Sequence, residues 1–283
     1  MLPADSCAIK KLTFRFDINE ARNHGQKGYD SMVLKVCGMT NVGKRRELNE
    51  DSFKICGFEG GAPLGVCILA DGMGGHNAGE VASSTATEIL AGELSEGLGK
   101  TDDNEICQSI AAAIDFANSR IYEKSLSNSE QAGMGTTLVV AYVKDDQLWV
   151  ANIGDSCAYV VNSKEICKIT IDHSIVEELV RRGTITREEA RNHPDKNIIT
   201  RALGTEDFVD ADYYDYKLSP GETVLLCSDG LTETVRDERI QEIIVNEESI
   251  DKVVTALIDE ANENGGVDNI TVVAFRVDKE DNK

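Results

Sequence analysis

The sequence predicts an α+β fold in which antiparallel β-sheets are covered by helices. Strand-like segments come in runs interrupted by pairs of helices, and this order is typical of antiparallel sheets with helices outside them. With 283 residues, 41% of them apolar, the chain can bury a substantial core. The sequence shows no internal repeat and no linker long enough to separate domains, so one domain with two sheets is expected.

The predicted strands are short apolar runs bounded by turn residues. Residues 136–143 and 148–153 are predicted to form a hairpin joined at Asp145-Asp146, and Gly133-Met134-Gly135 is expected to be a flexible hinge before it. The other expected strands are residues 33–37, 52–56, 66–70, 159–161, 166–169, 213–218, 222–227 and 270–277.

Apolar periodicity predicts the helices. Asn77 as the cap and Glu80 three residues later indicate a helix that continues to about residue 96. A second helix carries an apolar stripe made of Ile106, Ile110, Ala113, Ile114, Ala117 and Ile121. Two consecutive helices of this kind must cover one sheet face. Two more helices are expected around residues 240–244 and 250–261.

Residues 172–205 differ in character from the strands around them. Ser174 with Glu177 and Thr186 with Glu189 both have the spacing of a capping box, which indicates two short helices. A helical insertion between strands is a candidate lid or flap over a site. We therefore expect a flap at residues 172–205.

Residues 1–31 show only weak periodicity and are expected to be an N-terminal extension of unknown role. They could be a leader or could contribute an edge strand around residues 12–16. The main domain is expected to span residues 32–283.

The charge balance limits the possible partners. With 29 basic and 50 acidic residues, the chain has a net charge of −21, which argues against nucleic acid or an anionic membrane as partner. Eight scattered cysteines without a CxxC spacing fit reduced core residues rather than disulfides or a zinc site. No apolar run is long enough to cross a bilayer and no secretory signal is evident. The expectation is a cytoplasmic monomer.

Acidic residues stand where predicted strands begin or end. Asp71, Asp155 and Asp229 each follow an apolar run, and Asp268 precedes another. If these ends converge, the carboxylates share one partly dehydrated rim, where like charges raise each other's pKa or need a cation between them. Mg²⁺ and Mn²⁺ are the usual answer, because they favour carboxylate, carbonyl and water oxygens.

Single motifs in this set are weak evidence. Asp71-Gly72 alone is most often a turn, although a glycine lets its own carbonyl approach an ion closely. Glu50-Asp51 alone is more simply a solvated acidic turn, because neighbours in an extended segment point to opposite sides. The specific signal is therefore the ordered set of motifs.

Eight motifs occur in a fixed order along the chain. They are Arg46 to Asp51, Asp71-Gly72-Met73-Gly74-Gly75-His76, Gly133 to Thr137, Asn152-Ile153-Gly154-Asp155-Ser156, Asp172-His173-Ser174, Ile199 to Gly204, Ser228-Asp229-Gly230-Leu231 and Asp268-Asn269-Ile270-Thr271. From about residue 33 to residue 277 the chain thereby resembles the metal-dependent serine/threonine protein phosphatases of the PP2C (PPM) type, particularly compact bacterial members. The resemblance implies a β-sandwich of two antiparallel sheets flanked by helices, in α-β-β-α layers.

The resemblance also implies a binuclear site for Mn²⁺ or Mg²⁺. Asp51 and Asp71 correspond to ligands of the two metal ions. The Gly72 carbonyl corresponds to a ligand of one metal ion, and Asp229 and Asp268 correspond to ligands of the other. Two cations of this kind lower the pKa of water and offset charge in phosphoryl transfer.

Four further residues receive roles from the resemblance. Glu50 would act at least through metal-bound water, and Asp155, with Asp229, would hold a third, weaker ion. Arg46 would hold phosphate oxygens with its planar fork, and His76 would be the general acid, with a turn histidine as the alternative.

The function implied is hydrolysis of phosphoserine and phosphothreonine in proteins, including a cognate serine/threonine kinase. Two alternatives stay open: a non-catalytic scaffold with the same fold, and another two-metal hydrolase such as a nuclease, which the −21 charge disfavours. His173, just before a helix cap, is expected to be structural rather than a second acid. Ser156, Ser174 and Ser228 lack the partners of a serine nucleophile.

Overall fold

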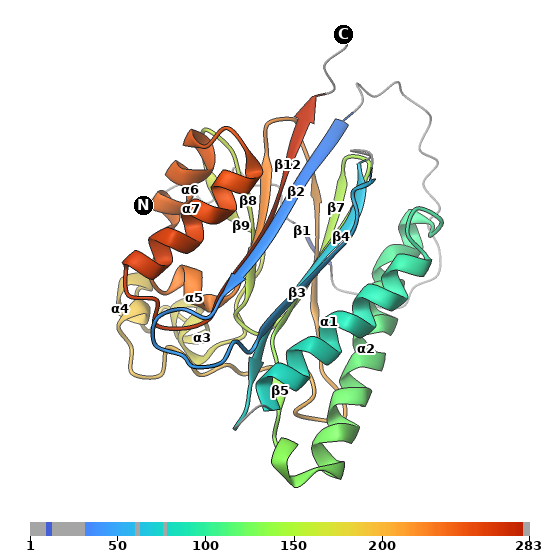
Figure 1. Ribbon diagram of the computed structural model, residues 1–283, viewed down its shortest axis with the longest axis vertical. Coiled ribbons are helices and arrows are strands. Elements are labelled where there is room, and N and C mark those ends of the chain that lie inside the picture. Colours follow the sequence, from blue (N-terminus) through green and yellow to red (C-terminus); the bar gives the residue numbers. More distant parts are fainter. Residues whose placement is uncertain (1–9, 13–31, 60–62, 76–77, 280–283) are drawn as a thin grey trace.

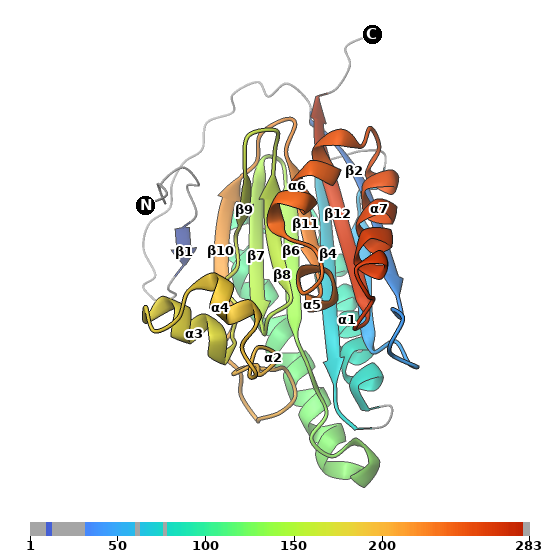
Figure 2. The same cartoon turned by 90° about the vertical axis from the view of Figure 1, so that its left-hand side faces the viewer.

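The computed structural model describes residues 10–12, 32–59, 63–75 and 78–279. Two antiparallel sheets pack face to face with helices on both outer sides (Figures 1 and 2). This arrangement confirms the predicted α-β-β-α layers. In the described part of the chain, every helix is too short or too polar to span a lipid bilayer.

The first sheet has the strand order β1-β10-β7-β6-β4-β3, with β5 beside β4. Its strands are β1 (Lys10–Leu12), β3 (Asp51–Gly57), β4 (Leu64–Met73), β5 (Gly135–Thr136), β6 (Leu138–Lys144), β7 (Gln147–Ile153) and β10 (Asp212–Lys217). The predicted hairpin is confirmed as β6 and β7, and Asp145 adopts a φ of 56° in its turn.

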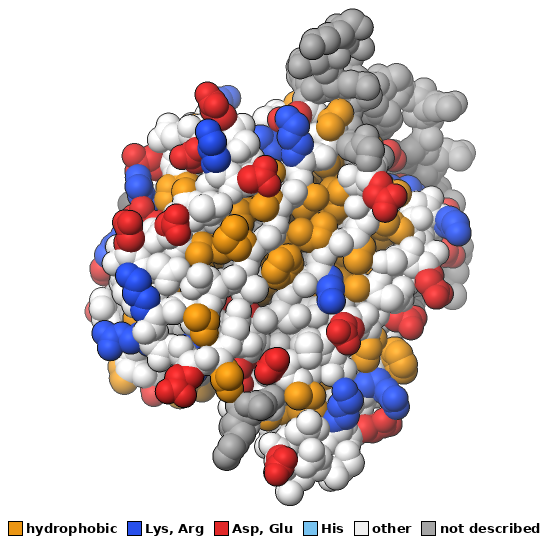
Figure 3. Space-filling model, viewed as in Figure 1, with side chains coloured by type: hydrophobic (Ala, Val, Ile, Leu, Met, Phe, Trp, Pro, Cys, Tyr) orange, Lys and Arg blue, Asp and Glu red, His pale blue; other side chains and the backbone are white. Residues whose placement is uncertain are grey.

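The second sheet has the order β2-β12-β11-β8-β9. Its strands are β2 (Met32–Asn41), β8 (Cys157–Val161), β9 (Ile166–Lys168), β11 (Thr223–Cys227) and β12 (Ile270–Lys279). The edge strands β2 and β3 of the two sheets lie beside each other (Figure 1). Apolar side chains gather on that face (Figure 3), where Val36, Phe53 and Ile55 are only partly buried.

The helices cover the outer faces as their apolar stripes require. Helices α1 (Ala78–Glu96) and α2 (Asp103–Ser127) pack on the first sheet, and α6 (Asp237–Asn246) and α7 (Ile250–Glu263) pack on the second. A 3₁₀ turn, Ser129–Gln131, follows α2, and the short α5 (Asp229–Thr232) follows β11. Residues 66–70 of strand β4 are all apolar because both faces of the strand are covered: Val66, Ile68 and Ala70 face the helices, whereas Cys67 and Leu69 face the second sheet.

The insertion between the strands contains α3 (Ile175–Arg181) and α4 (Arg187–Arg191), as expected. Thr186 and Glu189 form a full capping box. The capping box expected at Ser174 forms only in part: Ser174 accepts from the Glu177 amide, but the Glu177 carboxylate pairs with Arg187 at 3.1 Å instead. The ion pair with Arg187 thus replaces the hydrogen bond from the Ser174 amide to the Glu177 carboxylate that a complete capping box requires.

The prediction of a flexible hinge at Gly133-Met134-Gly135 is wrong. Met134 is fully buried in the core under α1 and α2, and Gly135 and Thr136 form β5 against β4. In the N-terminal region, β1 pairs with β10 at the sheet edge, whereas residues 13–16 of the expected edge strand lie outside the described residues. Asn77, the expected cap of α1, also lies outside them.

Candidate metal centre

The acids predicted to converge do meet at one end of the sandwich. Asp51 at the start of β3 and Asp71 near the end of β4 are direct partners across the two strands. Asp229 opens α5 directly after β11, and Asp268 lies two residues before β12. Burial raises the pKa of Asp71 well above its usual range, and the nearby charges of Asp51, Asp229 and Asp155 raise it further.

Asp51 is held by the opposite sheet. Its Oδ2 accepts hydrogen bonds from Ser228 Oγ at 2.8 Å and from Thr271 Oγ1 at 2.6 Å, and its buried Oδ1 has no partner in the protein. Burial raises the pKa of Asp51 to about 6 even though the two hydroxyl groups lower it. One oxygen is therefore fixed and the other is left for a ligand.

The main chain of Asp71 is anchored by two threonines. Its amide donates to Thr137 Oγ1 at 2.9 Å, and its carbonyl accepts from Thr136 Oγ1 and the Thr137 amide, both at 2.8 Å. At Gly72, a Cβ would lie 2.1 Å from the Gly79 carbonyl oxygen. Only glycine allows α1 to begin this close to the strand end.

Glu50 and Asp268 are linked by Asn269. The Glu50 amide donates to Asn269 Oδ1 at 2.9 Å, and the Asn269 amide donates to Asp268 Oδ1 at 2.8 Å. Burial raises the pKa of Glu50, and its buried Oε1 has no partner in the protein. Arg46 donates to Asp268 Oδ2 at 2.7 Å from a side chain that is 50% exposed, so its guanidinium lies at the rim.

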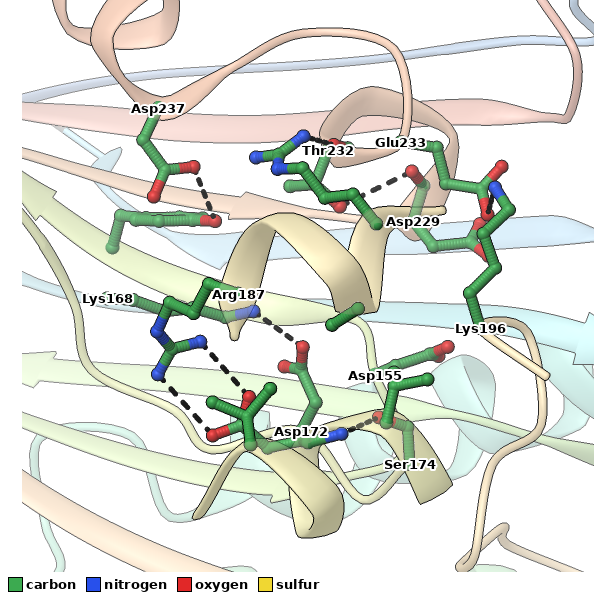
Figure 4. A pocket seen from close by; sticks show the side chains of 16 residues that line it. Asp155, Lys168, Asp172, Ser174, Arg187, Lys196, Asp229, Thr232, Glu233 and Asp237 are labelled. Atoms are coloured by element: carbon green, nitrogen blue, oxygen red, sulfur yellow. Dashed lines mark hydrogen bonds and ion pairs between the residues drawn. The ribbon is translucent and has the colours of Figure 1, made fainter. Parts of the chain in front are cut away.

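Asp155 and Asp229 line a cavity of about 200 Å³ beside the flap (Figure 4). Burial, together with the nearby charge of Asp172, raises the pKa of Asp155 to about 7. Burial also raises the pKa of Asp229 well above its usual range, with the Asp155 charge as the next cause. Lys168 neutralises Asp172 at 2.7 Å, but Asp229 Oδ1 is buried without a partner.

These observations fit a divalent cation. Unpartnered buried oxygens on Glu50, Asp51 and Asp229 are costly unless a proton or a cation satisfies them. Among the described residues, no three acid, histidine or cysteine side chains are already gathered around one metal position. Mg²⁺-type sites tolerate this, because they take one or two carboxylates and keep several waters.

The remaining histidine predictions have different outcomes. His76 lies outside the described residues, so its expected role as general acid stays a prediction. His173 is 6% exposed and bonded to the backbone, as a structural histidine would be. Sequence reasoning missed Ser228, Thr271 and Thr137 as groups that hold the acids. Ser228 and Thr271 lie in motifs that also contain an acid, whereas Thr137 lies in the motif of residues 133–137, which contains none.

Comparison with known proteins decides the family. The model of the family described as protein phosphatase 2C matches residues 41–271. This chain belongs to the protein phosphatase 2C family. It is 39% identical over 239 residues to the serine/threonine phosphatase stp of Listeria monocytogenes, covering 84% of this chain and 94% of the relative. It is 35% identical over 253 residues to the protein phosphatase PhpP of Streptococcus pneumoniae, covering 88% and 99%.

Solved structures of the protein phosphatase 2C type agree with this fold. The serine/threonine phosphatase Stp1 from Staphylococcus aureus superposes with a TM-score of 0.82 at 36% identity, covering 90% of this chain and 99% of that one. The catalytic domain of PstP in complex with two manganese ions gives a TM-score of 0.77 at 35% identity, covering 88% and 100%. The resemblance and fold class predicted from the sequence are confirmed.

Proposed function

We propose that this chain is a metal-dependent phosphatase that hydrolyses phosphoserine and phosphothreonine in proteins. The observation that carries the proposal is the buried group of acids at one end of the sandwich, three of which have an unpartnered oxygen. A solvated acidic surface would not need such burial, and a purely structural role would pair the oxygens. The relatives named serine/threonine phosphatases support the same reaction.

The proposed ligands are the acids of the two sheets. Asp51 and Asp71 would be ligands of a pair of Mn²⁺ or Mg²⁺ ions, with the Gly72 carbonyl on one ion and Asp229 and Asp268 on the other. Glu50 would act through a metal-bound water, and Asp155 with Asp229 would hold a third, weaker ion. When bound, the ions supply a water activated for in-line attack on phosphorus and offset the charge that develops there.

Arg46 is proposed to bind the phosphate. Its guanidinium is half-exposed at the rim and bonded to Asp268, so a phosphate can reach the remaining donors of its planar fork. Lysine would not offer the same paired geometry. His76 is proposed to protonate the leaving serine or threonine oxygen, since histidine titrates near neutral pH.

The substrates are proposed to be phosphorylated proteins, including a cognate serine/threonine kinase. The enzyme itself is proposed to be a monomer in the cytoplasm. Residues 172–205 are proposed to select among them, because α3 and α4 line the cavity that Asp155 and Asp229 share. A scaffold without activity would have no use for the full set of acids and Arg46. We assign no function to residues 1–31.

Hydrolysis of a phosphothreonine peptide in the presence and absence of metal tests the function. We expect turnover to require added Mn²⁺ or Mg²⁺ and to fall by more than about a hundredfold in Asp229→Asn. Asp259→Asn, which changes an exposed acid on α7, is the matched control and should retain activity. Turnover that persists in excess chelator would contradict the proposal. Calorimetry that finds no bound Mn²⁺ would favour the scaffold.

A further inference from the structure

His173 holds the turn that carries Asp155. The Gly154 amide donates to His173 Nδ1 at 3.1 Å, and the His173 amide donates to the Gly154 carbonyl at 2.9 Å. Gly154 has a φ of +94°, and a Cβ there would lie 2.7 Å from Thr137. The residue before Asp155 is thus in a left-handed conformation that is bonded on both sides to one buried histidine.

The bond from Gly154 fixes the state of the imidazole ring. Since Nδ1 accepts a hydrogen bond, the ring proton lies on Nε2, which is 3.3 Å from Asp212 Oδ2 and can donate to it. Arg201 Nη1 donates to Asp212 Oδ1 at 3.3 Å and to the Asp210 carbonyl at 3.1 Å. The carboxylate of Asp212 on β10 therefore accepts from the ring and balances the guanidinium, whose Nη1 approaches Nε2 to 3.3 Å without being its acceptor.

The same histidine contacts the flap. The Thr200 amide donates to the His173 carbonyl at 2.7 Å, and Ser174 forms a β-bridge with Ile199. The Ile175 amide donates to the Ile198 carbonyl at 3.0 Å, which closes the base of the flap. His173 thus joins three parts of the molecule: the Asp155 turn, strand β10 and the two ends of the flap in which it lies.

We propose that His173 is a positioning residue for Asp155. By accepting the Gly154 hydrogen bond it holds the turn that directs the Asp155 carboxylate into the cavity shared with Asp229, and by its main chain it ties that carboxylate to the closed flap base. This inference rests on the proposed role of Asp155 as a ligand of the weakest ion. A merely space-filling histidine would not depend on which ring nitrogen is replaced.

Two substitutions separate the ring nitrogens. In His173→Asn the side-chain oxygen can take the place of Nδ1 and accept from Gly154, whereas in His173→Gln the amide reaches the place of Nε2 and the Gly154 bond is lost. His193→Asn is the matched control, because His193 lies in the flap and its Nδ1 accepts from the Asp195 amide at 3.1 Å. Thermal melting verifies that each variant is folded.

The first measurement is hydrogen exchange of the Gly154 amide in the metal-free protein. We expect exchange at least about tenfold faster in His173→Gln than in the unmodified protein, and near the original rate in His173→Asn and His193→Asn. The second is Mn²⁺ titration by calorimetry. We expect the weakest ion to bind about tenfold less tightly in His173→Gln, with the tighter ions unchanged and His173→Asn restoring the affinity.

Equal effects of His173→Asn and His173→Gln on exchange and on the weakest ion would overturn the inference. So would an Asp155→Asn variant that keeps the weakest ion, because the positioned carboxylate would then not be its ligand. Neither result would decide whether the unmodified protein hydrolyses phosphopeptides. Absence of that hydrolysis would instead remove the proposed function, and exchange at Gly154 would still decide what His173 does.

Discussion

Two hydroxyl groups, from Ser228 directly after β11 and from Thr271 in β12, donate to one oxygen of Asp51 in the first sheet. Their effect is to keep a buried acid closer to its charged form than burial alone would allow, since each lowers the pKa that burial raises. The same bonds fix the carboxylate so that its other oxygen faces the site. Groups behind a ligand commonly set its orientation and basicity in this way.

Replacing Thr271 by valine tests this support. Thr271→Val removes the 2.6 Å hydrogen bond to Asp51 at a fully buried position while keeping a side chain of similar volume. We expect Mn²⁺ affinity measured by calorimetry to fall by about 10- to 100-fold. Thr255→Val, at an exposed position on α7, is the control and should bind Mn²⁺ normally. Unchanged affinity in Thr271→Val would show that Ser228 alone suffices.

At the scale of elements, the C-terminal end of the flap and the residues just after it depend on α2. Gly204 has a φ of +85°, and a Cβ there would lie 2.1 Å from Ile121 Cγ2 on α2. Asn118 on the same helix accepts from the Gly204 amide at 2.7 Å and donates to the carbonyls of Glu206 and Asp207. The helix thus sets the conformation of the chain where it leaves the flap and returns to β10.

Gly204→Ala should therefore be costly for two reasons, the left-handed backbone and the contact with α2. We expect the free energy of unfolding in urea to fall by more than about 2 kcal/mol. Gly221→Ala separates the two causes, because Gly221 has a φ of +91° but open space around it. That control should lose only about 1 kcal/mol. Equal losses in both variants would mean that the contact with Ile121 contributes nothing.

The elements also show what sequence could and could not predict. Acids that follow an apolar run, such as Asp71 and Asp229, were recognised because a buried apolar strand that runs into a carboxylate must be close to its end, although β4 continues two residues past Asp71. The support from Thr271 was not, because it depends on how two sheets pack and no local pattern encodes that. The cap at Ser174 was predicted only in part, since the sequence does not reveal that Arg187 lies close enough to take Glu177.

At the scale of the whole molecule, a chain of net charge −21 buries several of its acids at one point. In the metal-free protein, burial raises the pKa of Asp51 to about 6 and that of Asp155 to about 7. An unfolded aspartate titrates near a pKa of about 3.9. Folding therefore favours the protonated form of both aspartates. Their contribution to the stability of the folded state decreases as pH rises from about 4 towards these two pKa values and is lowest above them.

The melting temperature of the metal-free protein should consequently be higher at about pH 5.5 than at about pH 7.5, by roughly 3–6 °C. General self-repulsion of the acidic surface acts in the same direction.

Two variants that each remove one negative charge separate these effects: Asp155→Asn should flatten the pH dependence, and Asp259→Asn at an exposed position should not. Saturating Mn²⁺ should reverse the order, because bound cations need the deprotonated carboxylates and binding releases protons. Differential scanning calorimetry at the two pH values, with and without Mn²⁺, measures the four melting temperatures that this comparison needs. A metal-free protein that melts earlier at the lower pH would mean that its buried acids are already satisfied without a cation, which would contradict the metal site itself.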